Sequence, residues 1–321
     1  MGSSLSWSNS IATFEEGLNM SYFKIRSDNN NSLYSETGLH VALCFDKNYL
    51  YPAINTMNSV FAHNKNVVFL CLCSNLDDES RKVLLSIADY GVRLIELTWD
   101  KVIDTRFYPI DVAFNIYIPW IVPNVEKVLY IDPDMICLKS IEFLFNEDFT
   151  IAMAPEISGM VEGLTKNIFK ESTEFCYPFY FNSGTCFMNC GKIRKEHNVE
   201  EIDKEFIDKI ADYYLLDQDF LNKFYHNDIR PLSILWNVQF YEFDGCYFYK
   251  KAIKNAYFIH FSFHKPWRHT SSLKQSKLYL KYSTNHEIIL RVKAARRQRI
   301  RGKVLGFFLK PFALIKGRIR K

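Results

Sequence analysis

The sequence predicts an α/β fold with a mixed, mostly parallel sheet that is flanked by helices. Three observations lead to this prediction. The chain has 321 residues, which is enough to bury a large core. Short and almost wholly apolar segments are typical of buried strands. In the first half of the chain, segments with helical spacing alternate with these strands.

The first half of the chain contains four expected strands, and each is a compact apolar run. Between them lie segments in which apolar residues recur at helical spacing, and Asp77 and Asp78 precede one of these as expected caps. Alternation of this kind is typical of parallel strands joined by crossover helices. The expected strands are 39–45, 67–73, 92–97 and 127–131, and the expected helices are 50–63, 77–90 and 110–121.

The second half of the chain has a less regular pattern. Strands are expected at 151–154, 185–189 and 256–261, and a helix is expected over 199–215. Glu200, Glu201 and Asp203 lie near the start of this helix, where negative charge interacts favourably with the helix dipole. We therefore expect one domain over 37–270, with an arm before it at 1–36 and a tail after it at 271–321.

Charge is distributed unevenly between the body of the chain and its tail. Between Arg291 and Lys321 there are 12 Lys and Arg residues and no acidic residue, whereas the rest of the chain has 28 basic and 36 acidic residues. Ile300, Val304, Phe307 and Phe308 fall on one face of an expected helix in this tail. A basic amphipathic segment favours an anionic membrane surface as partner. A solvated or nucleic-acid-binding tail is the alternative, and the acidic body disfavours nucleic acid as a partner.

The cysteines and the hydropathy indicate a cytoplasmic protein. None of the eight cysteines forms a C-x-x-C pair, which argues against a zinc or redox motif and favours buried, reduced thiols. Residues 1–36 are rich in Ser and Asn and lack an apolar signal segment. No run of about 18 apolar residues occurs, so we expect no membrane-spanning helix.

Polar residues follow the carboxyl ends of two expected strands, where open α/β sheets bind ligands. Asp46, Asn48 and Tyr49 follow the strand at 39–45, and Asp132 and Asp134 follow the strand at 127–131. Two carboxylates one residue apart can hold one hard cation, such as Mg²⁺ or Mn²⁺. By itself such a pair is also explained by a solvated turn or a helix cap.

Three further segments contain residues that could take part in catalysis or binding. Each also has an ordinary structural interpretation. Asn and Ser before a strand are typical of turns, carboxylates at a helix start are typical of caps, and a histidine at a strand end is often a core residue. The residues are Asn182 and Ser183, then Asp217, Gln218 and Asp219, and finally His260, Lys265 and Trp267.

Together these segments resemble glycosyltransferase family 8, and especially the bacterial lipopolysaccharide core (1,3)-galactosyl- and glucosyltransferases. The likeness covers about residues 39–270, and the matching segments occur in the family's order and with roughly its spacing. The segments are HVALCFDKNYL at 40–50, KVLYIDPDMI at 127–136, YFNSGTCFMN at 180–189, LDQDFLN at 216–222 and IHFSFHKPW at 259–267.

The resemblance implies a GT-A fold and the retaining transfer of a sugar from UDP-galactose or UDP-glucose, with Mn²⁺ or Mg²⁺ as cofactor. It implies lipopolysaccharide core, or a related surface glycan, as the acceptor. The expected place of action is the cytoplasmic face of a bacterial inner membrane, with the tail bound peripherally to the anionic lipid surface.

The resemblance also assigns roles to individual residues. The metal ligands would be Asp132, Asp134 and His260. The donor-binding residues would be Asp46, Asn48 and Tyr49 around the uracil and ribose, Asn182 and Ser183 at the sugar, and Lys265 and Trp267 in a segment that closes over the diphosphate. The catalytic group would be Asp217 at the sugar hydroxyls, Gln218 near the anomeric carbon, and Asp219 as a neighbouring carboxylate.

An amide is a poor nucleophile, so we favour attack on the face from which the leaving group departs, with Asp219 as the alternative nucleophile. The chain also departs from the family. Asn115 stands where an arginine is usual, Phe263 stands where a glycine is usual, and Lys265 comes one residue early. Glu156 is a further match for an acid near the donor sugar. These departures leave a second interpretation, a catalytically inactive UDP-sugar-binding or scaffold protein of the same fold.

Overall fold

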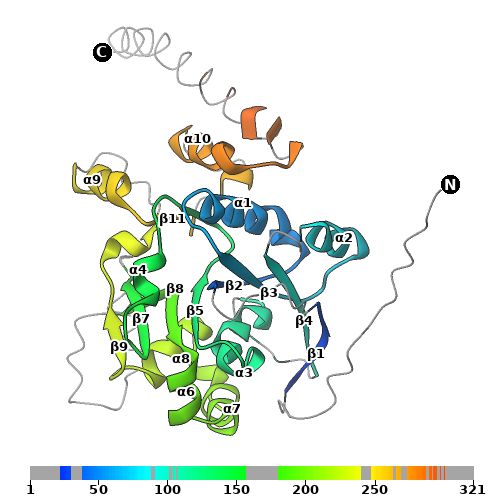
Figure 1. The fold of residues 1–321 in the computed structure, drawn as a ribbon, viewed down its shortest axis with the longest axis vertical. Helices are drawn as coiled ribbons and strands as arrows, with labels where there is room; N and C mark the ends of the chain where they lie inside the picture. Colours follow the sequence, from blue (N-terminus) through cyan, green and yellow to red (C-terminus); the bar gives the residue numbers. More distant parts are fainter. Residues whose placement is uncertain are drawn as a thin grey trace, which may run out of the picture.

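The computed structural model has the predicted α/β architecture, with one large sheet between two layers of helices (Figure 1). It describes residues 22–29, 38–87, 91–100, 103, 105, 108–156, 180–239, 247–262, 265–268, 273–286, 289–290, 292–294, 297 and 300. Phe263 and most of the tail, including Val304, Phe307 and Phe308, lie outside the described residues.

The large sheet has eight strands in the order β1-β4-β3-β2-β5-β8-β7-β9. Strands β4, β3, β2 and β5 are mutually parallel, as the alternation of strands and helices predicts. Strand β8 runs antiparallel to both β5 and β7, and β1 runs antiparallel to β4. The bounds are β1 Phe23–Asp28, β2 Leu39–Phe45, β3 Val67–Cys73, β4 Val92–Trp99, β5 Lys127–Ile131, β7 Ile151–Pro155, β8 Phe181–Asn189 and β9 Ile229–Pro231.

Side chains of the central strands alternate between two hydrophobic cores. In β2, Val41 and Leu43 point to the core beneath α1 and α2, while Ala42 and Cys44 point to the core beneath α3, α6, α7 and α8 (Figure 1). Both faces are covered, which is why these strands are apolar at every position. The helices are α1 Leu50–Phe61, α2 Asp78–Ser86, α3 Ile118–Ile121, α4 Glu142–Phe145, α6 Cys190–Glu196, α7 Val199–Ile207 and α8 Asp217–Phe224.

A second, smaller sheet brings together strands from distant parts of the sequence. Its order is β10-β11-β6, with bounds Val238–Gln239, Phe258–His260 and Met135–Cys137. Strand β6 begins only three residues after the end of β5, beyond Asp132, Pro133 and Asp134. The small sheet therefore lies directly beside the carboxyl end of β5. Helices α9 (Tyr247–Asn255) and α10 (Leu273–Tyr282) complete the described elements of this region.

Helix α10 packs against α1 even though it lies in the segment expected as a tail. The side-chain amides of Asn55 and Asn58 in α1 donate to the carbonyls of Tyr279 and Tyr282, at 3.2 and 3.1 Å. Both tyrosines are buried. The packing of the domain therefore continues past residue 270.

Strand β1 lies in the segment expected as an arm. It pairs with β4 at the edge of the sheet, and Arg93 holds Asp28 through two hydrogen bonds of 2.9 and 2.6 Å. Only its first residue, Phe23, is deeply buried, where it packs edge-on against Trp99 and Tyr117. Because the other strand residues are mostly exposed and polar, the segment lacks the apolar run by which the other strands were recognised.

Other boundaries differ from the sequence expectation by a few residues. Strand β8 begins at Phe181 rather than at 185, and the helix expected over 110–121 is a 3-10 helix over Ile110–Tyr117 followed by α3. The helix expected over 199–215 ends at Ile207, and a 3-10 turn at Ile210–Asp212 follows. Asn198 opens this helix with a reciprocal capping box, in addition to the acidic residues seen in the sequence.

The described cysteines are buried free thiols, as predicted. Burial raises the pKa of each of them, as for Cys71 and Cys186, so they are poorly reactive. Cys176 and Cys246 lie outside the described residues. Among the helices that the structure describes, none has the length and hydropathy needed to cross a membrane.

Candidate active site

A cavity of about 470 Å³ lies at the carboxyl ends of β2 and β5. This is the size of a small-molecule site, and it lies at the sheet edge where α/β folds bind ligands. The cavity brings together most of the residues that the sequence singled out. Its lining includes Asp46, Tyr49, Asp132, Asp134, Asn182, Ser183, Asp217, Gln218, His260 and Lys265.

The turn from β5 into β6 holds the two carboxylates in place through main-chain contacts. The N–H of Asp132 donates to the carbonyl of Gly184 in β8 at 3.1 Å, and the carbonyl of Asp134 accepts from the N–H of Phe261 at 3.1 Å. The hydroxyl of Thr56 in α1 lies 2.8 Å from the carbonyl oxygen of Met135. It also accepts a hydrogen bond from the main-chain N–H of Met135 at 3.2 Å. Two sheets and a helix therefore fix this turn.

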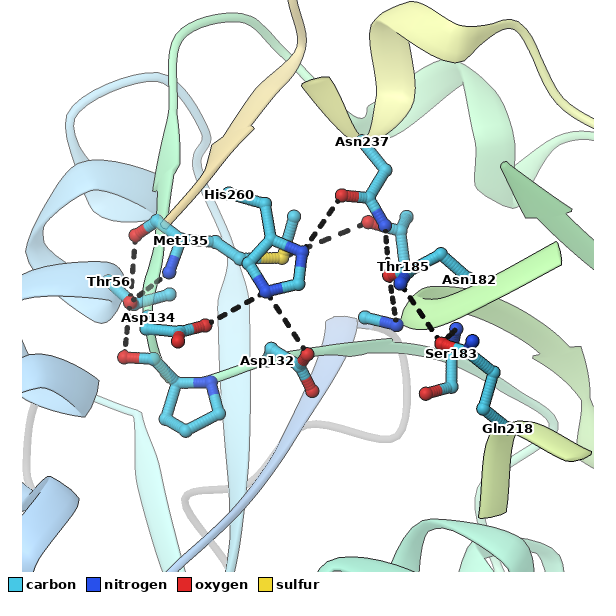
Figure 2. Close-up of polar contacts among 12 residues, drawn as sticks. Thr56, Asp132, Asp134, Met135, Asn182, Ser183, Thr185, Gln218, Asn237 and His260 are labelled. Carbon is cyan, nitrogen blue, oxygen red and sulfur yellow. Dashed lines mark hydrogen bonds and ion pairs between the residues drawn. The ribbon is translucent and has the colours of Figure 1, made fainter. Parts of the chain in front are cut away.

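His260 completes a three-residue cluster with the two carboxylates (Figure 2). Its Nε2 lies 3.3 Å from Asp132 Oδ2 and 3.2 Å from Asp134 Oδ1. The antiparallel register between β11 and β6 pairs His260 with Met135, directly after Asp134. The tertiary fold thus places the imidazole of His260 beside the carboxylates of Asp132 and Asp134, although they are distant in the sequence.

The charges in this cluster are strongly coupled. Burial acts to raise the pKa of Asp134, yet Lys265 and His260 outweigh burial and hold that pKa well below its usual value. Asp132 differs, since burial raises its pKa despite the opposing effect of His260. Burial acts to lower the pKa of His260, but the carboxylates of Asp134 and Asp132 raise it. The Nζ of Lys265 contacts Asp134 Oδ2, so a cation already lies against the carboxylate.

The donor set and the space around it fit a divalent cation. Two carboxylate oxygens and one imidazole nitrogen lie within 4.8 Å of one another, and such mixed ligands suit Mn²⁺ or Mg²⁺. Asp134 Oδ1 is buried and faces His260 Nε2 across 3.2 Å. A Cβ at Gly184 would lie 2.7 Å from Asp132 Oδ2 and 2.7 Å from the His260 ring, so only glycine leaves this space open.

Neutral amides line the side of the cavity next to β8 and α8. Asn182 donates to Gln218 Oε1 at 2.9 Å and to Glu156 at 2.7 Å. Gln218 Oε1 also accepts the N–H of Ser183 at 3.1 Å, while its Nε2 is buried and has no hydrogen-bond partner among the described residues. The Gln218 amide therefore keeps its oxygen engaged with Asn182 and Ser183.

Asp217 is held by the residue that replaces the expected arginine. Asn115 Nδ2 donates to Asp217 Oδ2 at 2.6 Å, and both side chains are buried. Burial raises the pKa of Asp217 to about 7, because the neutral amide of Asn115 only partly offsets the loss of water. Position 115 therefore supplies Asp217 with a hydrogen bond and with no positive charge.

Asp219 does not line the cavity. Its Oδ1 accepts the hydroxyl of Tyr180, and its Oδ2 accepts the N–H groups of Tyr214 and Leu215 at 2.6 and 2.8 Å. Both carboxylate oxygens are thus committed to holding the chain that leads into α8. This arrangement favours a structural role for the carboxylate over that of a nucleophile.

The third side of the cavity is formed after β2. Asp46 caps a 3-10 turn by accepting the N–H groups of Asn48 and Tyr49, at 3.0 and 3.3 Å, and it also accepts the Asn48 side chain. Trp267 packs edge-on against Tyr49, with ring centroids 6.1 Å apart. Neither Asn48 nor Trp267 lines the cavity, but each contacts a residue that does, Asp46 and Tyr49 respectively.

The structure adds residues that sequence reasoning missed. Tyr108 and Asp111 enter the cavity from the segment before α3, and Gln239 and Ser262 enter from the small sheet. Tyr108, Asp111 and Gln239 are isolated polar residues outside the matching segments, whereas Ser262 lies inside the segment at 259–267 but had no predicted role. Asn237, which joins His260 to Asn182, was missed because it too is an isolated polar residue.

The fold is that of GT-A glycosyltransferases of known structure. Galactosyltransferase LgtC, solved in complex with donor and acceptor sugar analogues, superposes with a TM-score of 0.61 at 19% identity, over 79% of this chain and 100% of that chain. The bifunctional glycosyltransferase WbbM superposes with a TM-score of 0.63 at 19% identity, over 82% of this chain and 52% of that one.

The model of glycosyl transferase family 8 matches residues 40–271, so the chain belongs to this family. It is 25% identical to lipopolysaccharide 1,3-galactosyltransferase of Salmonella typhimurium, over 77% of this chain and 78% of the relative. It is 22% identical to lipopolysaccharide 1,2-glucosyltransferase of Escherichia coli, over 71% and 73%. Family and relatives together support a glycosyltransferase activity and confirm the resemblance inferred from the motifs.

Proposed function

We propose that the protein transfers galactose or glucose from a UDP-sugar to lipopolysaccharide core or a related surface glycan, with retention of configuration and with Mn²⁺ or Mg²⁺. The observation that carries this proposal is the cluster of Asp132, Asp134 and His260 in a cavity that is also lined by the amides of Asn182 and Gln218. The cluster suits a cation bound to diphosphate, and the amides suit sugar hydroxyls. The names of the relatives supply the sugars and the acceptor class.

On the charged side, Asp132, Asp134 and His260 would hold the cation through the atoms that already converge. A bound Mn²⁺ or Mg²⁺ supplies Lewis-acid stabilisation of the negative charge that develops on the diphosphate leaving group. Lys265 lies at the same carboxylate and carries a second positive charge toward the diphosphate oxygens. Fixed charges in a buried site stabilise such a leaving group more strongly than they would in water.

On the opposite side, Asn182, Ser183, Asp217 and Gln218 would bind and orient the donor sugar. The contacts of Gln218 support same-face attack, since its carbonyl oxygen is turned toward Asn182 and Ser183 and not toward the cavity. The engaged oxygens of Asp219 support it further. In this mechanism the acceptor hydroxyl gives its proton to the departing phosphate, and no covalent sugar–enzyme bond forms.

At the third side, Asp46 and Tyr49 would contact the uracil and ribose, with Asn48 and Trp267 in contact with them. In this arrangement each of the three parts of a UDP-sugar would contact a different wall of the cavity. The nucleoside lies beside the turn after β2, the diphosphate beside the charged cluster, and the sugar beside β8 and α8.

The test is UDP release from a panel of UDP-sugars, each measured with Mn²⁺, with Mg²⁺ and with EDTA. The proposal predicts release that requires the metal and prefers UDP-galactose or UDP-glucose, and that a truncated lipopolysaccharide core accelerates. Binding of UDP without release, even with that acceptor, would instead indicate the inactive donor-binding protein. The uncharged Asn115 is the observation that keeps this second function under test.

The basic tail is proposed to bind the anionic inner-membrane surface on the cytoplasmic side. Its support is the charge distribution, with 12 basic and no acidic residues between Arg291 and Lys321. Deletion of 291–321 should abolish binding to vesicles that contain anionic lipid while leaving intact the release of UDP from the UDP-sugar in the presence of a soluble acceptor. Unchanged vesicle binding by the truncated protein would contradict this assignment.

A further inference from the structure

Asn237 lies between the charged cluster and the amide side of the cavity (Figure 2). Its Oδ1 lies 3.0 Å from His260 Nδ1, and its Nδ2 lies 2.7 Å from Asn182 Oδ1. The side chain is fully buried. Both of its polar atoms are therefore used to join two groups that belong to different sheets and different walls.

The backbone of Asn237 is fixed on both sides. The carbonyl of Trp236 accepts the hydroxyl of Thr185 at 3.1 Å, and the N–H of Asn237 donates to Ile234 at 3.1 Å. The next residues form β10, in which Gln239 pairs with His260 in parallel register. The amide is therefore held at a fixed place beside the imidazole.

The direction of each hydrogen bond in the series that links Asn182, Asn237 and His260 follows from main-chain donors. The N–H of Gly184 donates to one atom of the Asn182 amide at 3.0 Å, and a main-chain N–H can only donate, so that atom is the oxygen. The atom of Asn237 that faces this oxygen must then be its nitrogen. The other atom, which faces His260 Nδ1, must be the Asn237 oxygen.

An oxygen accepts and cannot donate, so His260 Nδ1 must carry a proton. The ring nitrogen left for a metal ion is then Nε2, the atom that lies between Asp132 and Asp134. This conclusion holds whether or not Nε2 is itself protonated in the absence of metal. The orientation of the metal-binding histidine is thus dictated by a glycine N–H in β8, through two amides.

The same series continues to Gln218. Since the oxygen of Asn182 is occupied by Gly184 and Asn237, its nitrogen must face Gln218, and Gln218 Oε1 accepts from it. The N–H of Ser183 confirms this direction independently, because it donates to the same oxygen. The nitrogen of Gln218 is consequently the amide atom that neither Asn182 nor Ser183 contacts.

We propose that Asn237 is a positioning residue that couples the metal site to the sugar side of the cavity. Its oxygen fixes His260 so that Nε2 faces the cation, and its nitrogen fixes Asn182 and, through it, the donor face of Gln218. The inference rests on the proposed function, since it assumes that the charged cluster binds a cation. It adds a residue with two separable tasks.

The two tasks are separated by two substitutions at one position. Asn237→Ala removes both contacts, and loss of the partner of a metal-binding histidine typically weakens metal affinity about 10–100-fold. Asn237→Asp keeps an acceptor for His260 but places an oxygen against the oxygen of Asn182. The aspartate variant should therefore bind Mn²⁺ at least as tightly as wild type, yet release UDP more slowly at saturating Mn²⁺.

The experiment is a titration of the full-length protein with Mn²⁺ alone, followed by electron paramagnetic resonance, with thermal unfolding as the control for folding. Asn55→Ala is the matched control, because Asn55 is an equally buried amide that bonds to α10 and not to the site. It should bind Mn²⁺ like wild type. Wild-type affinity in Asn237→Ala would overturn the proposal, as would an equal loss of affinity in both Asn237 variants.

If the alanine variant does not fold, the aspartate variant decides alone. Retained Mn²⁺ affinity with slower UDP release supports the coupling, whereas unchanged release or lost affinity contradicts it. Failure of the proposed function gives a different result. In that case wild-type protein would not bind Mn²⁺, or Asp134→Ala would bind it equally well, whatever the Asn237 variants do.

Discussion

The two walls of the cavity, one beside β5 and β11 and the other beside β8 and α8, are lined by different types of residue. The wall beside β5 and β11 concentrates charge, with Asp132, Asp134, His260 and Lys265 in contact. The wall beside β8 and α8 carries the amides of Asn182 and Gln218, which are joined by a hydrogen bond, together with the buried carboxyl of Asp217. Charge suits a cation and a diphosphate, and amides suit hydroxyl groups, which is the basis of the proposed division of the cavity into a phosphate side and a sugar side.

The difference also shows where rigidity comes from. The charged wall is held by main-chain contacts from three elements, among them Thr56 in α1. The amide wall is held by a chain of side chains that begins at the N–H of Gly184. Asn237 is the point at which the two meet, so damage to one wall should be separable from damage to the other everywhere except there.

The largest effect is expected on the charged wall. Asp134→Ala removes one of three converging ligands and should lower UDP release by at least about 10³-fold, or ~4 kcal/mol in the barrier. Asp148→Ala, an exposed carboxylate that pairs with Lys192, is the matched control and should have wild-type rates. Circular dichroism should show both variants folded. Normal turnover by Asp134→Ala at matched Mn²⁺ would remove the metal site from the account.

On the amide wall, Gln218→Glu should lower kcat by about 10²-fold, the typical effect of losing one directed hydrogen-bond donor at a reaction centre. The variant keeps an oxygen for Asn182 and Ser183 but loses the N–H donors of the amide. Its Mn²⁺ affinity should equal that of wild type, which distinguishes the two walls. Detection by mass spectrometry of a glycosyl adduct on Asp219 or on Gln218 would contradict the same-face mechanism.

Asp217 gives the amide wall a pH dependence in stability. Its folded pKa is raised to about 7, so between about pH 4 and pH 7 the unfolded chain releases a proton that the folded protein keeps. The free energy of unfolding should therefore fall as the pH rises through this window. Above about pH 7, Asp217 should cause no further loss of stability. Asp217→Asn lacks this charge and should exceed wild type by ~1–3 kcal/mol at pH 8, with little difference at pH 4. Urea unfolding in EDTA measures this, and equal stabilities at pH 8 would contradict the buried charge.

The smallest expected effect concerns the support of the charged wall. Thr56→Val keeps the shape of the side chain but leaves the buried N–H of Met135 without its acceptor, which should cost about 1–3 kcal/mol of stability. Ser86→Ala in α2, whose hydroxyl bonds at an exposed position, is the control and should change little. Thermal unfolding would show the difference, and identical melting of both variants would mean that α1 does not hold the turn.

Sequence patterns were sufficient for the parallel half of the sheet. Residues such as Val41, Leu43 and Phe69 are apolar because both faces of their strands are covered, and that pattern is local. The antiparallel strand β8 was only half predicted, since Asn182 and Ser183 interrupt its apolar run. They are polar because they line the cavity, so function obscures the strand signal there.

The residues of the site were predictable where they lie in motifs and not where they act through space. Asp132 and Asp134 are recognisable because they directly follow a strand. Asn237 is one isolated polar residue, and its role appears only when residues 182, 237 and 260 meet in three dimensions. Asp219 shows the reverse case, because a carboxylate inside a recognisable motif has both of its oxygens committed to Tyr180, Tyr214 and Leu215.

The most direct test of the account is calorimetric titration of UDP into the protein, with Mn²⁺ and with EDTA. The account predicts that UDP binds more tightly with Mn²⁺, and that this gain disappears in Asp134→Asn, because the charged wall binds metal and diphosphate as one unit. Equal UDP affinity with Mn²⁺ and with EDTA in the wild-type protein would contradict the division of the cavity into a phosphate side and a sugar side.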